Sequence, residues 1–599
     1  MKHFRNPFTQ PHPKRPSPLV VSMLFSALAV ALPVHAQSTK ITPPDPSPEL
    51  RRQDERTQAQ RQREESSVDV QSPAIALEST RLSRSESPCF RIDALQISNV
   101  DQAAVSTDRA NLQSDEFVWL MAALAGPQGD DSPKGKCLGA QGVALVLKRA
   151  QQSLLQRGFV TSRVLAQEQD LSSGTLALTL IPGHVNTIRF KDAGMPGVRL
   201  GNTVPIHSGD LLNLRDVEQG LENLKRVPTA EADIQIEPAQ DNAAPGQSDL
   251  VISYQQRSPL RLSLTVDDSG SKGTGIYQGS ATLSLDNPLG LSDLFYFTAN
   301  HDLGGGDAGA RGTRGNTVHY SLPLGYWLLG ATYSSSRYFQ NIAGLNQDYV
   351  YSGTSENSEL KLSRLVYRDA VRKTSLSLKA WQRRSNNFID DTEVQVQRRV
   401  VGGWELGANH KEPVGDATLE ASLAYKRGTG DFDSIAAPEE TFNEGRSRFG
   451  LWSLEVTAAV PFQVTQHSAR YNVSLHVQDN STPLTPQDRL AIGGRYSVRG
   501  FDGESSLAAE RGWTLRNDFS LALGDSGQEA YLGLDAGEVG GPGSERLLGN
   551  TLSGGVLGLR GSFKVSKSKL QYDLFVGTQL NKPDGFRTAQ TVAGFSLSF

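Results

Sequence analysis

Few residues in this chain have the types and spacings that catalysis requires. Gly304–Gly309 matches the G-x-G-x-x-G pattern of dinucleotide-binding loops, but no helix is predicted to follow it, so a surface loop is the better interpretation. Asp390 and Asp391 form an acidic pair that is more typical of a solvated turn than of a calcium site. The sequence contains no His-Glu-x-x-His, Gly-x-Ser-x-Gly or Walker-type motif. We therefore expect no enzyme activity, no cofactor and no bound metal.

The chain has only two cysteines, Cys89 and Cys137, which are too few to build a cysteine-rich metal site. In an oxidising compartment, such a pair is expected to form a disulfide that closes a loop of about 50 residues. The alternative is two unpaired thiols.

Residues 1–36 predict a signal peptide. Basic residues precede an apolar run from Leu19 to Leu32, and Ala36 completes a small-residue cleavage site. That run is too short to span a bilayer, and no later stretch reaches the required length of about 18 apolar residues. The net charge of −4 gives no basic field for nucleic acid. The mature chain is therefore predicted to be exported, as a soluble protein or as a β-barrel.

Residues 37–87 are predicted to form a polar helix followed by a linker. Ser47, Pro48 and Glu49 have the pattern of a helix start, with Ser47 as the N-cap. The segment from Glu49 to Glu65 is mostly Glu, Arg and Gln and has almost no apolar face, so it cannot pack in a core. It is either a solvated linker or a helix inside a polar, water-lined cavity.

Two small α/β domains are predicted next, over residues 88–182 and 183–257. In the first, the order is strand, helix, helix, strand, strand, and Gly158 ends the second helix. The second repeats this plan less clearly, with Leu214, Val217, Leu221 and Leu224 on one helical face. The predicted elements of the first are Phe90–Ile97, 114–125, 139–157, Phe159–Gln167 and Thr175–Ile181; the strands of the second are Val185–Phe190, Ala232–Ile236 and Leu250–Tyr254.

From residue 258 to Phe599, polar and apolar residues alternate strictly. In Tyr471–Gln478 every odd position is apolar and every even position is polar. A soluble β-sandwich has the same period, but this region is long, has no helical interruption and ends on an aromatic residue, which favours a transmembrane barrel. At roughly 20 residues for each strand with its connection, the region would supply about sixteen antiparallel strands.

An ordered set of motifs along this region resembles the two-partner secretion transporters, which are outer-membrane pores for filamentous haemagglutinins, haemolysins and contact-dependent toxins. The Val498-Arg499-Gly500-Phe501 segment is similar to the signature tetrad on the family's sixth surface loop, and Gly533–Gly537 is similar to the barrel-wall motif that partners it. The other segments that carry the resemblance are Asp286–Asp293, Tyr320–Trp327, Asn387–Asp391 and Arg427–Gly430.

The resemblance implies two periplasmic POTRA domains, a plug helix near residues 49–65, and a barrel in the outer membrane that works as a monomer. It implies that the POTRA domains recognise an unfolded partner, such as an adhesin, haemolysin or toxin, and that the barrel secretes it. Phe599 would be the signal that the barrel-assembly machinery recognises. The alternative function is that of a barrel-assembly factor from the same superfamily, which usually carries more POTRA domains.

Arg499 and Asp535 are the residues predicted to hold the sixth surface loop inside the barrel. That loop, roughly Ser481 to Glu510, is rich in Gly, Ser and Pro, so we expect polar rather than apolar contacts to hold it. Asp535 has the parity opposite to its apolar neighbours, which places it in the lumen, and Gly533 and Gly537 leave room beside it. An arginine can bind such a carboxylate with two parallel hydrogen bonds. The alternative is that Arg499 is a solvated loop residue.

Overall fold

The computed structural model of the chain describes residues 44–65, 68–70, 79–83, 86–99, 117–192, 197–240, 244–344, 347–565 and 568–599. The predicted signal peptide, residues 1–36, lies outside the described residues, as do parts of the predicted linker and the start of the predicted helix 114–125. Within the described ranges, no helix is both long and apolar enough to cross a membrane.

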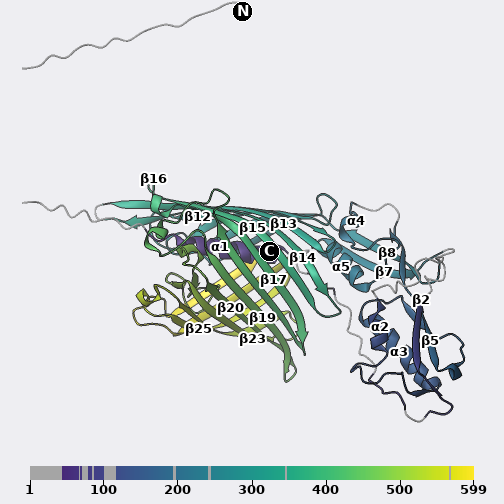
Figure 1. Ribbon diagram of the computed structural model, residues 1–599. Helices are drawn as coiled ribbons and strands as arrows, with labels where there is room; N and C mark the ends of the chain where they lie inside the picture. Colours follow the sequence, from purple (N-terminus) through teal and green to yellow (C-terminus); the bar gives the residue numbers. More distant parts are fainter. Residues whose placement is uncertain are drawn as a thin grey trace, which may run out of the picture. The chain divides into compact units, whose positions relative to one another are not determined.

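More than half of the chain forms a closed antiparallel β-barrel of sixteen strands, as the sequence alternation predicts (Figure 1). The last strand, β27 (Thr591–Ser598), pairs with the first, β9 (Leu260–Asp267). A two-residue strand, β16 (Thr392–Glu393), only extends the hairpin beside β15. The remaining barrel strands are β10 (Tyr277–Asp286), β11 (Leu294–Gly304), β12 (Gly312–Leu324), β13 (Trp327–Ala343), β14 (Asp348–Arg368), β15 (Lys373–Ile389), β17 (Arg399–Val414), β18 (Ala417–Thr429), β19 (Gly450–Val464), β20 (His467–Asn480), β23 (Arg511–Ala522), β24 (Gln528–Gly540), β25 (Thr551–Val565) and β26 (Ser568–Asn581).

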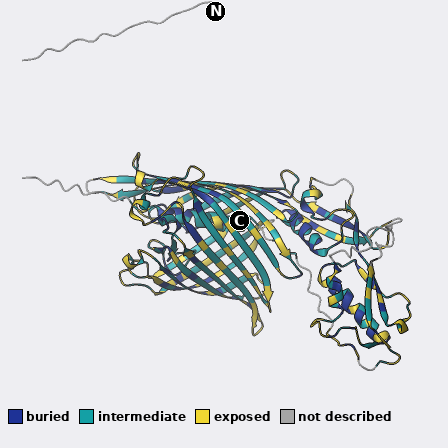
Figure 2. Ribbon diagram, viewed as in Figure 1, coloured by how far each residue is buried: buried dark blue, intermediate teal, exposed yellow. Residues whose placement is uncertain are grey.

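The barrel wall has an apolar outer face and a polar inner face. On β9, Leu262 and Leu264 are exposed on the outside, whereas Thr265 and Asp267 are buried on the inside. Most barrel strands show the same alternation of more buried and more exposed residues (Figure 2). It is the pattern of a barrel whose outside meets lipid and whose inside is wet.

The connections between strands differ at the two ends of the barrel. At one end, three of the turns that the structure describes contain only two residues each, 325–326, 415–416 and 465–466. The other end carries long loops, including residues 430–449 and residues 481–510, which we call loop five and loop six. Loop six contains a small hairpin of β21 (Leu490–Ile492) and β22 (Leu507–Ala509).

The first small domain has a three-stranded sheet of order β2-β5-β4 packed on two helices. Val146 and Leu154 on one helix and Leu176 on the central strand are fully buried in its core. Cys89 and Cys137 form the disulfide that the cysteine count predicts, beside the short β1–β3 ladder. The elements are β1 (Phe90–Arg91), β2 (Ala94–Asn99), α2 (Trp119–Ala123), β3 (Cys137–Leu138), α3 (Ala140–Gln156), β4 (Arg163–Leu165) and β5 (Thr175–Ile181).

Two predicted strands of this domain are wrong in extent. The predicted strand Phe90–Ile97 is split, because β1 pairs with β3 while β2 pairs with β5. The predicted strand Phe159–Gln167 shrinks to β4, because the chain at Phe159 still completes the helix end: the Phe159 N–H donates to the Leu154 carbonyl. Gly158 ends α3 with a positive φ of 95°, as predicted.

The second small domain has a sheet of order β6-β8-β7 covered by α5. Val217 and Leu224 of α5 are buried against it, and the same apolar cluster includes Leu294 and Tyr296 of barrel strand β11. The core of this domain is therefore continuous with the short-turn end of the barrel. Its elements are β6 (His184–Phe190), α4 (Leu200–Thr203), α5 (Leu214–Lys225), β7 (Ala230–Pro238) and β8 (Gln247–Gln256).

The polar helix predicted near the N-terminus is α1 (Ser47–Glu64). Figure 1 shows it in purple among the barrel strands. The prediction of Ser47 as N-cap is wrong: Pro46 is the N-cap, and Ser47 is the first helical residue. The N–H of Ser47 donates to the Asp45 carboxylate at 2.9 Å, so an upstream acid supplies the capping acceptor.

Candidate functional site

The lumen of the barrel contains α1, which is bonded to the wall through polar side chains. Gln60 donates from Nε2 to the hydroxyls of Thr282 and Thr298, at 2.6 and 3.0 Å. Arg61 donates from Nη2 to Thr332 and Glu359, at 2.9 and 3.1 Å. These contacts show that the segment is a helix inside a polar cavity and not a solvated linker.

One face of α1 is buried although its residues are polar. Glu49, Gln53, Gln60 and Glu64 recur at spacings of four and seven residues and therefore share that face. Leu50 is the one large apolar residue of the helix, and it packs against Tyr338 and Tyr351. A helix with this composition is stable only where polar partners surround it, as they do in a barrel lumen.

The two ends of α1 contact opposite ends of the barrel. At the short-turn end, Glu64 accepts from Ser284 at 3.0 Å and from Arg261 at 3.3 Å. At the long-loop end, Glu49 accepts from the Thr274 hydroxyl at 3.0 Å, and Arg52 donates to the Gly503 carbonyl in loop six at 2.6 Å. Eighteen helical residues span about 27 Å, close to the hydrophobic thickness of a bilayer. The helix therefore runs the length of the pore.

The chain that follows α1 is clamped where it leaves the barrel. The N–H of Val70 donates to Glu222 of α5 at 2.8 Å, and its carbonyl accepts from Arg368 at the end of β14. Asp69 pairs with Lys373 and, at 2.6 Å, with Lys411. Burial alone would raise the pKa of Asp69, but the hydrogen bonds from the two lysines outweigh it and lower that pKa. We call these residues the linker clamp.

Arg368 is the centre of the linker clamp. Its side chain is 2% exposed and pairs with Glu218 at 3.2 Å and Glu222 at 3.0 Å, both on α5. It also donates to Gln219 at 3.2 Å. These residues carry no signal in the sequence, because nothing in the order of the chain shows that α5 meets the β14–β15 turn.

Loop six folds into the lumen, and Arg499 meets Asp535 there. Arg499 donates from Nε to Oδ2 at 2.6 Å and from Nη2 to Oδ1 at 2.8 Å, and its backbone N–H donates to Oδ2 at 3.0 Å. Asp518 of β23 is a further partner, with 2.6 Å between Nη2 and Oδ1. The side chain of Arg499 is thus not solvated. Asp518 was not predicted, although its parity on β23 also places it in the lumen.

Glycines on the wall make this approach possible. A Cβ added to Gly533 would lie 2.6 Å from Nη2 of Arg499, and one at Gly537 would lie 3.0 Å from a methyl of Val498. Gly500 has a φ of 92°, and a Cβ there would lie 2.4 Å from the Thr578 carbonyl. Larger residues at these positions would push the loop off the wall.

The expectation that polar contacts alone hold loop six is wrong. Its apolar residues, although few, are concentrated at the contact and share a buried cluster with the wall. The cluster consists of Ile492, Val498, Phe501, Leu507 and Ala509 from loop six with Val539, Leu552 and Phe586 from the barrel. Loop six is therefore held by an apolar contact as well as by the Arg499–Asp535 pair.

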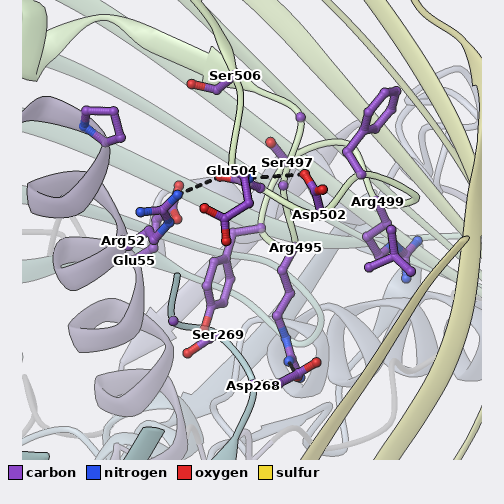
Figure 3. Close-up of a pocket in the computed structure, with 18 of the residues that line it drawn as sticks. Arg52, Glu55, Asp268, Ser269, Arg495, Ser497, Arg499, Asp502, Glu504 and Ser506 are labelled. Atoms are coloured by element: carbon purple, nitrogen blue, oxygen red, sulfur yellow. Dashed lines mark hydrogen bonds and ion pairs between the residues drawn. The ribbon is translucent and has the colours of Figure 1, made fainter. Parts of the chain in front are cut away.

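A cavity of about 210 Å³ lies between α1 and loop six, beside the Arg52–Gly503 hydrogen bond (Figure 3). Arg52 and Glu55 of α1 line one side, and Arg495, Arg499 and Glu504 of loop six line the other. Within the described residues, no group of three or more His, Cys, Asp or Glu side chains is arranged to hold a metal ion. The site is a polar barrel lumen that α1 occupies.

Phe599, the predicted assembly residue, lies where the barrel closes. Its N–H donates to the Leu264 carbonyl and its carbonyl accepts from the Leu264 N–H, both at 2.8 Å. The residue is 46% exposed, and it lies on the lipid side beside Leu264. The residue thus extends the pairing of the last strand with the first.

Together, the closed barrel, the plugged polar lumen and the two α/β domains define a POTRA-bearing outer-membrane transporter. The chain belongs to the family described as haemolysin secretion/activation protein ShlB/FhaC/HecB, whose model matches residues 246–561. Models of POTRA domains match residues 131–183 and 184–238.

Known proteins resemble the chain over two thirds or more of its length. It is 35% identical over 559 residues to the outer membrane transporter CdiB-2 of Burkholderia pseudomallei strain 1026b, covering 91% of this chain and 93% of that protein. It is 25% identical over 407 residues to the hemolysin transporter protein ShlB of Serratia marcescens, covering 67% and 71%. The solved structure of CdiB from Acinetobacter baumannii matches with a TM-score of 0.78 and 32% identity, over 93% of this chain and 99% of that one.

Proposed function

We propose that this transporter recognises one large exported protein in the periplasm and secretes it, unfolded, through the barrel after α1 has left the lumen. The observation that carries the proposal is α1 itself. A helix that packs by hydrogen bonds such as Gln60–Thr282 can leave for water without exposing an apolar face. A permanent core element would be apolar on the side that it buries.

The two POTRA domains offer edges at which an extended chain can pair. In the sheets β2-β5-β4 and β6-β8-β7, the outer strands have one unpaired side within the sheet. Strand addition uses backbone hydrogen bonds and tolerates many sequences. Because the sequence has no Walker-type motif for binding a nucleoside triphosphate, we propose that folding of the partner outside the cell drives transport.

Several finer assignments belong to this proposal. We assign residues 1–36 to a signal peptide, 37–87 to the plug and linker, 88–182 and 183–257 to the POTRA domains and 258–599 to the barrel. The protein would act as a monomer without nucleic acid, cofactor or catalytic activity, and would be inserted by the barrel-assembly machinery through Phe599. The partner would be an adhesin, a haemolysin or a contact-dependent toxin.

The alternative is a barrel-assembly factor, and a depletion experiment separates the two functions. Cells that lack this protein should retain their other outer-membrane barrels but lose a single large protein from the culture medium. Mass spectrometry of the medium would identify that protein. Loss of many barrels from the membrane, with unchanged secreted proteins, would instead show an assembly factor.

A further inference from the structure

The seam between the first and last strands is only partly paired. β9 ends at Asp267, and β27 pairs with it only over Ser596–Ser598, with Phe599 adding one more pair. β27 nevertheless begins at Thr591. Among the strands that the structure describes, none pairs with the β9-facing side of β27 from Thr591 to Phe595.

This unpaired edge lies within the apolar belt of the barrel. Phe595 is registered with Leu574 on the neighbouring strand β26. Leu574, Val576 and Leu580 face outward and are exposed, so the lipid-facing surface continues beyond the level of Phe595. On the lipid side no water is available at this depth, and a backbone group left unsatisfied there costs several kcal/mol.

Two side chains satisfy the backbone of Phe595 at this edge. Its N–H donates to Oδ1 of Asp268 at 3.0 Å, and its carbonyl accepts from Nη1 of Arg495 at 3.1 Å. Asp268 is the residue directly after β9, at the position where the next backbone pair of the ladder would fall. Asp268 and Arg495 also pair with each other, and both side chains are mostly buried (Figure 3).

We propose that Asp268 and Arg495 form a side-chain rung that replaces the missing backbone pair at Phe595 and so extends the seam of the barrel by one pair. Arg495 belongs to loop six and lies four residues before Arg499. The docking of loop six on the wall therefore also supplies half of the rung. If loop six moves away from the wall, Arg495 moves with it and the Phe595 carbonyl loses its hydrogen-bond donor. This holds whatever protein is transported.

Amide hydrogen exchange of the full-length protein in lipid nanodiscs tests the rung. Asp268→Ala and Arg495→Ala should each increase exchange in peptides covering 591–598 by about tenfold, the effect of losing a hydrogen bond to a charged group. Asp268→Asn keeps an acceptor oxygen but loses the charge that faces Arg495, so it should increase exchange by less than Asp268→Ala does. Arg489→Ala is the matched control, because Arg489 lies in loop six but donates to Glu444 in loop five.

Three results would overturn the proposal. Exchange in 591–598 could be unchanged in both alanine variants, which would show that the seam does not need the pair. Asp268→Asn could behave like Asp268→Ala, which would show that charge and not the acceptor matters. Exchange could rise equally in β23 and β24, which would show a general loosening of the barrel. A shift confined to β27, with Asp268→Asn between wild type and Asp268→Ala and with Arg489→Ala near wild type, would support it.

Discussion

The guanidinium of Arg499 and the carboxylate of Asp535 form a two-point pair inside the barrel, with distances of 2.6 Å from Nε to Oδ2 and 2.8 Å from Nη2 to Oδ1. Both residues are buried, with exposed fractions of 6% and 3%. A pair in such surroundings is costly to break, because removal of one partner leaves an uncompensated charge, at about 3–5 kcal/mol.

Arg499→Ala and Asp535→Ala should therefore each sharply reduce secretion of the partner while the barrel still assembles. Arg499→Lys should not restore it, since a lysine cannot make two parallel hydrogen bonds. The double alanine variant should be no worse than either single variant, because both remove the same interaction. Secreted partner is measured in the medium, and assembly by the heat-modifiable mobility of the barrel. Normal secretion by Arg499→Ala would contradict the docking role.

Removal of residues 37–66, which include α1, should raise the single-channel conductance in planar bilayers. The reason is that α1 runs the length of the pore and fills part of it with side chains bonded to the wall. Secretion should be largely retained, since the plug must leave during transport. Gln62→Ala, at an exposed position of α1, should leave conductance unchanged. Equal conductance with and without the segment would mean that α1 does not obstruct the pore.

The features that the sequence predicts well are those encoded by local periodicity. Alternation in a strand specifies which side chains face lipid, so Leu262 and Leu264 identify the barrel and parity places Asp535 in the lumen. The lack of an apolar face on α1 likewise indicates polar surroundings before any partner is known.

The features that it predicts poorly depend on contacts between distant segments. Arg368 and Glu222 are separated by 146 residues, and Arg495 and Asp268 by 227. No local sequence pattern indicates that residues so far apart in the chain are in contact. The apolar residues of loop six, such as Val498 and Phe501, have no period of their own, so only the assembled wall shows that they form a cluster.

Acid should destabilise the first POTRA domain through Asp131. Burial alone would raise the pKa of Asp131, but hydrogen bonds from Lys136, Arg149 and the Leu82 N–H outweigh it and hold the pKa well below the usual range. Because the folded-state pKa is below the unfolded value of about 3.9, the stabilisation is fully present above pH 4 and is lost as pH falls through the folded pKa.

Hydrogen exchange of the full-length protein checks this pH dependence. Peptides of α3 should exchange faster on acidification below about pH 4, after correction for intrinsic rates. Asp131→Asn should show faster exchange already at neutral pH, since Arg149 is then buried without its counter-charge, at a cost of about 3 kcal/mol. Asp170→Asn, at an exposed turn, serves as the control. If the acid response persists in Asp131→Asn, a group other than Asp131 causes the response.

Deletion of Phe599 should lower the amount of protein in the outer membrane without affecting export across the inner membrane. The deletion removes two backbone hydrogen bonds to Leu264, and with them the lowest pair of the seam. Phe599→Ala keeps those backbone groups but loses the ring, so it shows which of the two matters, while Phe599→Tyr should stay near normal. Membrane fractionation and the extent of signal-peptide removal are the measurements. Normal outer-membrane levels after deletion would remove Phe599 from the assembly signal.

The linker clamp should control how often the plug leaves the pore. Asp69 and Val70 follow α1 by only a few residues, so the helix cannot be drawn far toward the periplasm while both are held. Arg368→Ala removes a buried side chain that bonds the linker and α5 together, which costs about 1.5 kcal/mol or more. That loss corresponds to about a tenfold rise in the open probability of the channel.

Single-channel recordings of the full-length protein should show longer and more frequent openings for Arg368→Ala and Asp69→Ala, with the open-state conductance unchanged. Arg364→Ala is the matched control: it removes an arginine from the same strand, β14, where the side chain lies over the Trp327 ring at 5.0 Å and takes no part in the clamp. High salt should weaken the wild-type clamp at Asp69, which is partly exposed, more than at Arg368, which is not. If Arg368→Ala opens no more often than Arg364→Ala, the clamp does not hold the plug, and contacts within the lumen such as Arg61–Glu359 must retain it alone.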